Sequence, residues 1–144
     1  CSPSHPLARK SAFKLSDIAP YPWIAPPAGS PLYADLKNAL ESIGIKDFRV
    51  SFTGGSLTSI ISVMAGSKSL TVLPYSVVFM QAHTKTIAAL PVKLEHPIRE
   101  LGFLWRSDRV ARPAVKRFQK FLETEFSSLA QRIDEKGRNL VWRE

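Results

Sequence analysis

One stretch of the chain, residues 51–74, constrains the fold more than any other. It begins at the end of a run, 48–52, whose aromatic and branched side chains favour a β-strand. Small polar residues at 53–56 precede apolar residues at helical spacing, 57–64, and a second strand-like run follows at 70–73. Strand, polar turn, helix and strand in this order indicate a parallel α/β unit, in which the amino end of the helix faces a ligand beside the sheet.

The sequences on either side of this stretch alternate between strand-like and helix-like patterns. Gly66 is expected to end the helix of the central unit. The other expected elements are, in chain order, one helical turn at 15–18 with Ser16 as its cap, a strand at 21–25, a helix from the cap Ser30 and Pro31 to Gly44, a helix or strand at 75–80, a strand at 86–91, a strand at 101–105, and a long helix from Pro113 to Gly137. The alternation predicts the α/β class, with a mixed, mostly parallel sheet flanked by helices.

The long helix has a wide apolar face. Its apolar positions recur every three or four residues, and they are Val115, Phe118, Phe121, Leu122, Phe126, Leu129 and Ile133. A face of this kind needs a sheet to cover, but only one strong strand-like run, 101–105, lies near it in the sequence. Either residues 1–90 supply that sheet, or the rest of it lies outside this chain.

The net charge of +8, from 20 basic and 12 acidic residues, raises the question of nucleic-acid binding. The basic residues are spread along the chain, and the densest run, 106–120, falls on the polar side of the long helix and in the loop before it. A solvated helix face explains this run, because Phe118 within it belongs to the apolar face and does not alternate with the charges as aromatic residues do in single-strand binders. Direct DNA binding by this chain is an alternative that a salt-dependent mobility shift would reveal.

The sequence shows no signal for a membrane or for secretion. No apolar run approaches the length that crosses a bilayer, and the first residues lack the apolar core of a signal peptide. Cys1 is the single cysteine, so neither an internal disulfide nor a cysteine metal cluster is expected. This composition fits a reducing cytoplasm, and we expect a cytoplasmic protein without membrane contact.

Residues that commonly catalyse reactions are not assembled in a recognisable pattern. His5, His83 and His96 are isolated from one another in the sequence, and a surface or turn position is the default for each. The Gly-x-Ser-x-Gly nucleophile pattern and the glycine-rich nucleotide patterns are absent, and no acidic pair is placed for acid–base work. We expect no enzyme, and therefore no catalytic residue, no metal and no cofactor.

The polar turn before the central helix is the best candidate for a binding site. A helix leaves its first N–H groups free and carries partial positive charge at that end, so it suits an anion such as a carboxylate. Gly54 would let a ligand approach closely, Thr53 would add a hydroxyl donor, and Phe52 would pack on the organic part of the ligand. The alternative is structural: Thr53 or Ser56 caps the helix and Phe52 belongs to the core. Capping and binding can also coexist.

Short segments between residues 3 and 128 share their order and spacing with a known family. The chain resembles the effector-binding domain of LysR-type transcriptional regulators in SHPLA (4–8), LSDI (15–18), YPWI (21–24), GSPL (29–32), VMAG (63–66), LTVLP (70–74) and LWRSDR (104–109). The sequence departs from the family after Gly66, where a second glycine often follows and Lys68 stands here.

The resemblance implies a fold like that of the type 2 periplasmic binding proteins, with two α/β subdomains and an effector in the cleft between them. Residues of about 8–90 would form the second subdomain, about 91–135 would be the returning strand and helix of the first, and 136–144 would be a tail. The first half of the first subdomain and the winged helix-turn-helix domain of the family would lie outside this chain.

The resemblance also implies a site and partners. The turn Ser51, Phe52, Thr53 and Gly54 would contact the effector, and Pro26 would belong to the neighbouring wall. The domain would sense a small anionic effector, form a homo-oligomer (a dimer or tetramer), and control transcription, with DNA bound only through the domain absent here. Alternatives are a solute-binding protein or an enzyme of the same fold, and the residues encoded before Cys1 would separate the first of these from a regulator.

Overall fold

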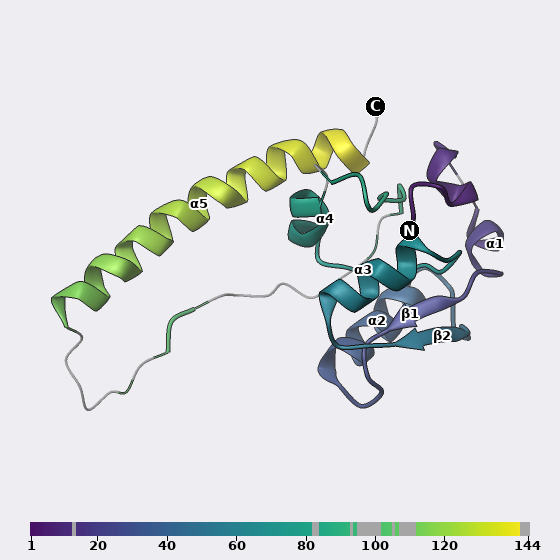
Figure 1. Ribbon diagram of the computed structural model, residues 1–144, viewed down its shortest axis with the longest axis horizontal. Coiled ribbons are helices and arrows are strands. Elements are labelled where there is room, and N and C mark those ends of the chain that lie inside the picture. The colour runs from purple at the N-terminus through teal and green to yellow at the C-terminus, as the bar shows by residue number, and fades with distance from the viewer. Residues whose placement is uncertain are drawn as a thin grey trace.

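The computed structural model describes residues 1–12, 14–81, 84–92, 94, 102–104, 106 and 112–141. Two regions stand out in Figure 1: a compact α/β body built around two strands, and a long helix that leads away from it. The described elements, in chain order, are the 3-10 helix η1 (Pro6–Arg9), α1 (Leu15–Ile18), β1 (Trp23–Ala25), α2 (Pro31–Ser42), β2 (Val50–Thr53), α3 (Leu57–Ala65), α4 (Tyr75–Gln81) and α5 (Pro113–Val141).

The sheet of the body is short and parallel. β1 and β2 pair so that Ala25 lies opposite Thr53, with an irregular register between the first two residues of β1. On the other edge of β1, Leu70 forms a single parallel bridge with Trp23, and the Ile24 N–H donates to the Leu70 carbonyl at 2.8 Å. β1 is therefore central, and the predicted strand at 70–73 is wrong beyond this one bridge.

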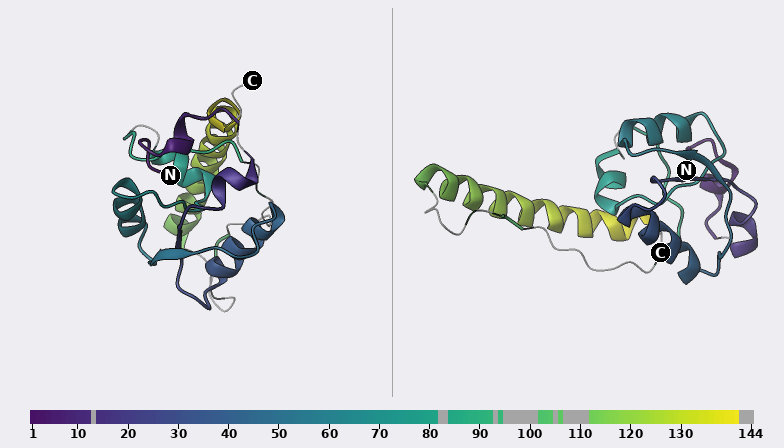
Figure 2. Two further views of the ribbon diagram at one scale, coloured as in Figure 1. Left: turned by 90° about the vertical axis from the view of Figure 1, so that its right-hand side faces the viewer. Right: turned by 90° about the horizontal axis from the view of Figure 1, so that it is seen from below.

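Two helices cover the opposite faces of β1, as alternation along a strand requires. Trp23 and Ala25 pack with Leu36 and Leu40 of α2, whereas Ile24 packs with Ile60 and Met64 of α3 in a second cluster. The three layers can be followed in Figure 1 and from two other directions in Figure 2. The predicted α/β class with parallel pairing and flanking helices is confirmed.

The caps of the first helices show which local rules operate. Ser30 accepts a hydrogen bond from the Tyr33 N–H at 3.2 Å, so its predicted role as the cap of α2 is confirmed. The predicted Ser16 cap of α1 is wrong, because Ser16 lies inside the first turn and Lys14 holds the cap position. There the Asp17 carboxylate accepts from the Lys14 N–H at 2.9 Å and pairs with Lys10 at 3.3 Å.

The segment after α3 differs from expectation at 86–91 as well as at 70–73. Gly66 ends α3 as predicted, and residues 75–81 form α4, which decides between the helix and strand left open by the sequence. The predicted strand at 86–91 is wrong, because among the described residues the backbone of this segment hydrogen-bonds to only one residue of another segment. Cys1 and Ala88 exchange two hydrogen bonds, of 2.8 and 3.0 Å. Among the described residues, these bonds do not extend into a strand ladder.

α5 begins at Pro113 as predicted and ends later than expected. It continues through Gly137 to Val141, so the expected stop and most of the expected tail are wrong; one glycine weakens a helix without breaking it. Trp142 lies outside the described residues. Of the predicted strand at 101–105, residues 101 and 105 also lie outside them, and residues 102–104 are not in a strand.

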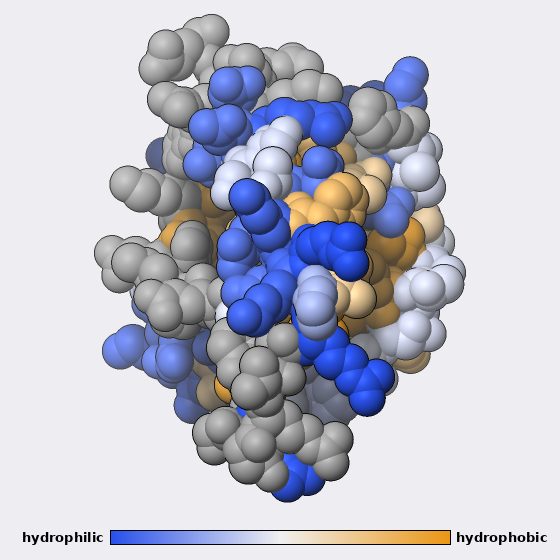
Figure 3. Space-filling model, turned by 90° about the vertical axis from the view of Figure 1, so that its left-hand side faces the viewer, coloured by the Kyte–Doolittle hydropathy of each residue, from blue (hydrophilic) through white to orange (hydrophobic). Residues whose placement is uncertain are grey.

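The apolar face of α5 is largely exposed. The exposed fractions of Val115, Phe118, Phe121 and Phe126 are 52%, 60%, 57% and 52%. α5 contacts α4, which lies beside the C-terminal half of α5 in Figures 1 and 2. Figure 3, which views the molecule from the side toward which α5 extends, shows apolar surface between hydrophilic side chains. The described residues of 1–90 therefore do not supply the sheet that this face needs.

No helix in the described part of the chain is long and apolar enough to cross a membrane.

Candidate functional site

The carboxyl ends of β1 and β2 bring the predicted site residues to one edge of the sheet. Because the strands are parallel, Thr53 at the end of β2 lies opposite Ala25 at the end of β1. The Gly54 N–H donates to the Ala25 carbonyl at 3.1 Å, which fixes the turn next to Pro26. Thr53, Gly54 and Pro26 are thus neighbours in space, although 26 positions or more separate the two segments in sequence.

Phe52 and Gly54 depend on each other. A Cβ atom at position 54 would lie 2.6 Å from Cε1 of Phe52, which is closer than two non-bonded carbon atoms can approach each other. The half-buried Phe52 ring itself packs on the cluster of Ile24, Ile60 and Met64 beneath α3. The ring therefore occupies the space that any side chain at 54 would need, and it belongs in part to the core, as the structural alternative proposed.

The capping alternative is right about the position of Ser56 and wrong about its side chain, and Thr53 does not cap α3. Ser56 holds the cap position of α3, but its side chain makes no capping hydrogen bond, and only its carbonyl takes part, by accepting from the Ile60 N–H at 3.0 Å. The exposed Thr53 side chain has no hydrogen-bond partner among the described residues. Both hydroxyls are therefore available at the amino end of α3.

The first backbone amides of α3 are also open. Leu57, Thr58 and Ser59 are exposed, and their N–H groups make no hydrogen bond to the residues that the structure describes. An α-helix leaves these donors without an intrahelical acceptor and carries partial positive charge at this end. The turn thus presents several hydrogen-bond donors to an approaching ligand.

Ser51 has a different environment from the other predicted residues. Its hydroxyl donates to the Trp23 carbonyl at 3.3 Å and shares a 2.8 Å hydrogen bond with the hydroxyl of Ser69. These contacts connect β2 to the segment on the far side of β1. The hydroxyl of Ser51 is engaged within the sheet, whereas that of Thr53 is free.

Sequence reasoning missed two residues that hold this edge together. Ser69 is 2% exposed and bonds to Ser51, and the Thr71 hydroxyl donates to the Ile24 carbonyl at 3.1 Å. The sequence does contain a signal for these two contacts, namely the hydroxyl residues on either side of Leu70. Alternate positions along an extended segment face the same way, so both hydroxyls can reach the neighbouring strands. On the wall formed after β1, Pro26 is half-buried and Pro27 is exposed.

The described residues hold no metal-binding group: no three histidine, cysteine, aspartate or glutamate side chains among them gather closely enough to hold an ion. The donors of the site are backbone amides and neutral hydroxyls. Such a set binds and orients a small molecule, but by itself it supplies no proton acceptor or nucleophile activation.

An open helix amino end at the carboxyl edge of a parallel sheet is the place where many α/β domains bind a ligand. The family model described as LysR substrate binding domain matches residues 1–127. The chain therefore belongs to the LysR substrate-binding domain family, whose fold is periplasmic-binding-protein-like and whose members regulate transcription. No curated protein and no solved structure matched the chain.

Proposed function

We propose that this chain is the ligand-sensing part of a LysR-type transcriptional regulator and binds a small anionic effector at the turn between β2 and α3. One observation carries the proposal. The amides of Leu57–Ser59 and the hydroxyl of Thr53 are open donors at the positive end of the same helix. Family membership supports the sensing role, and the open donors support the choice of an anion.

The parts of the turn suit different parts of such an effector. The amides at the start of α3 would bind the carboxylate or another anionic group, and Thr53 would donate a further hydrogen bond. Gly54 keeps the approach open because it has no side chain, and the half-buried Phe52 ring offers an apolar surface next to it. Pro26 and Pro27, which have no N–H to donate, would shape the opposite wall. Ser51 would act indirectly, by holding β2 against β1.

The division of the chain follows the same proposal. Residues of about 8–90 correspond to the second subdomain, and about 91–135 to the returning part of the first. The exposed apolar face of α5 supports this division, because the described residues of the body leave it uncovered. The effector would lie between the subdomains and would shift their relative angle by binding one arrangement more tightly than the other. A cytoplasmic homo-oligomer would pass that change to DNA-binding domains carried by other parts of the regulator.

The test is Thr53→Ala in a regulator chain that contains both subdomains. Small mono- and dicarboxylates, such as benzoate and succinate, are titrated while the amide signals of Leu57–Ser59 are followed by NMR. We expect one class of carboxylate to move these signals, and Thr53→Ala to weaken its binding about tenfold, the effect of losing one hydrogen bond to a charged group.

The control for this test is Thr124→Ala, which removes an exposed hydroxyl that bonds to the Lys120 carbonyl on α5. It should leave carboxylate affinity unchanged. Binding that is equally tight with and without the Thr53 hydroxyl would remove Thr53 from the site. Carboxylates that bind without moving the α3 amides would refute the anion site altogether.

A further inference from the structure

The carboxyl end of α3, opposite the proposed effector turn, is held by side chains from the first residues of the chain. The Ser2 hydroxyl donates to the Ala65 carbonyl at 3.4 Å, and Nε2 of His5 lies 3.3 Å from the Lys68 carbonyl. These carbonyls belong to the last residue of α3 and to the turn that follows it. Ser2 is 3% exposed and His5 is 1% exposed, so both contacts are inside the protein.

Both ring nitrogens of His5 have assigned partners, and the partners define one protonation state. The Leu7 N–H donates to Nδ1 at 3.1 Å, which makes Nδ1 an acceptor without a proton. The Lys68 carbonyl only accepts, so Nε2 carries the hydrogen. The ring is therefore the neutral tautomer with its proton on Nε2. A second proton on Nδ1 would face the Leu7 N–H, and that hydrogen bond would be lost.

No carboxylate among the described residues is close enough to the ring to compensate for a positive charge. The charged and titratable groups that face it are the Lys68 ammonium, the amino terminus of Cys1 and the phenol of Tyr21, whose ring lies 4.4 Å away edge-on. None of them is a carboxylate that could pair with a protonated ring. Burial lowers the pKa of His5 and the two positive charges lower it further, while the hydrogen bond to the Lys68 carbonyl opposes them.

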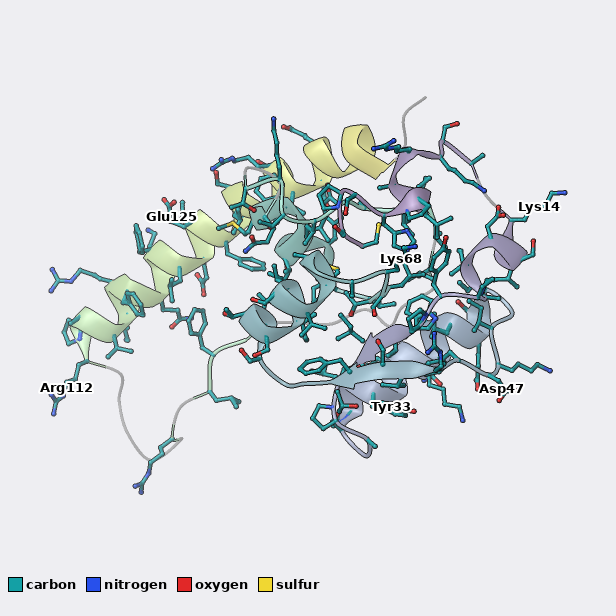
Figure 4. All side chains as sticks on the ribbon, turned by 45° about the vertical axis from the view of Figure 1, so that its right-hand side comes forward. Lys14, Tyr33, Asp47, Lys68, Arg112 and Glu125 are labelled. Carbon is teal, nitrogen blue, oxygen red and sulfur yellow. The ribbon has the colours of Figure 1, made fainter. Side chains whose placement is uncertain are left out.

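We propose that Ser2 and His5 form a latch that holds residues 1–9 on the carboxyl end of α3, and that protonation of His5 opens this latch. Opening would free η1, whose first turn depends on the hydrogen bond between Leu7 and His5. It would also loosen the contact of Cys1 with Ala88, because both lie on the same short segment. In Figure 4 the labelled Lys68 lies beside the ribbon of this N-terminal segment.

The direction of the pH effect follows from the neutral state of the closed latch. A histidine that stays neutral in the closed form stabilises that form fully when the pH is above the ordinary histidine pKa of about 6.5. This stabilisation is lost as the pH falls toward the lower pKa that His5 has in the closed form. Because one proton is taken up on opening, the opening equilibrium changes by up to tenfold per pH unit between the pKa of the closed form and that of the open form. Below the lower of these two pKa values it does not change further.

The test follows the His5 ring, the Leu7 amide and the Ala88 amide of the 144-residue chain by NMR from about pH 8 to about pH 5. We expect the ring to titrate below its midpoint in the urea-unfolded chain, and the Leu7 amide to move with the same midpoint. Exchange of the Ala88 amide, corrected for the intrinsic effect of pH, should accelerate up to tenfold per pH unit in the same window.

Two variants separate the latch from general acid sensitivity. His5→Gln keeps a donor and an acceptor but does not titrate, so the pH dependence of the Leu7 amide should disappear. The Ala88 exchange should keep only the pH dependence of the Cys1 amino group, which donates to the Ala88 carbonyl and whose pKa burial lowers to about 6. Ser2→Ala removes the contact with Ala65 and should accelerate exchange equally at every pH. A His5 ring that titrates at or above its unfolded midpoint would overturn the proposal, as would a Leu7 amide that ignores the ring. The wild-type titration decides the question if His5→Gln does not fold.

Discussion

The compact body and α5 use apolar residues in opposite ways. In the body, Ile24, Leu40 and Met64 have no exposed surface and lie in clusters that α2 and α3 close on either side of β1. On α5, Val115 and Phe118 are more than half exposed. Both regions have the residue spacing of amphipathic helices, so spacing alone does not distinguish a helix with a covered face from one without. The difference shows that the apolar side chains of the body are covered by its own elements, whereas the apolar face of α5 is not covered by the described residues.

The largest effect expected from this comparison is in the core of the body. Leu40→Ala should lower the free energy of unfolding by about 2–5 kcal/mol, because the fully buried side chain leaves a cavity between α2 and β1. Leu32→Ala on the same helix is the matched control. Leu32 is 55% exposed, and its loss should change stability by less than about 0.5 kcal/mol. Urea unfolding measures both, and equal effects would show that α2 is not packed as described.

A second pair of variants makes the same substitution in each region and predicts opposite signs. Gly44 ends α2 with φ of +88°, and an added Cβ would lie 3.0 Å from a methyl group of Leu15. Gly44→Ala should therefore destabilise the body by about 1–2 kcal/mol. Gly137 lies inside α5, where alanine is the better helix former, so Gly137→Ala should stabilise that helix by up to about 1 kcal/mol.

Thermal unfolding followed by circular dichroism would distinguish these two changes. Gly44→Ala should lower the midpoint of the cooperative transition. Gly137→Ala should raise the helical signal or its resistance to heating without lowering that midpoint. A stabilising Gly44→Ala variant would contradict the left-handed backbone at the end of α2.

The smallest effect on stability is expected on α5. Phe118→Ser replaces a ring that is 60% exposed, so the unfolding free energy of the body should change by less than about 0.5 kcal/mol. The same change should reduce binding of an apolar dye and concentration-dependent association, because exposed apolar surface drives both. A loss of stability as large as that of Leu40→Ala would mean that the face of α5 is covered in solution.

Local chemistry made much of the body predictable from its sequence. Ser30, Pro31 and Gly44 mark the ends of α2, and Gly66 marks the end of α3, because caps and glycines act within one turn of chain. Strand extent was less predictable. Residues 70–73 and 86–91 have β-favouring side chains, but a strand forms only where another backbone is at hand, and here a bridge at Leu70 and a contact at Cys1 are what the fold provides.

The candidate site was predictable in position and less so in detail. A strand followed by polar residues and a helix indicates where a ligand could bind, which led to Thr53 and Gly54. The sequence does not show that the Phe52 ring fills the space over Gly54, or that Ser51 bonds across β1 to Ser69. Both depend on which side of a short sheet each residue faces, and that is decided by packing at long range in sequence.

The length of α5 has a mechanical consequence. At 29 residues the helix is about 44 Å long, and α4 contacts it near its C-terminal half while its first turns extend away from the body. A helix held in this way acts as a lever: a tilt of about 5° at the contact with α4 would move the far end, roughly 22–44 Å away, by about 2–4 Å. Any surface that binds the exposed face of α5 would thus receive a small change in the body as a displacement of atomic size.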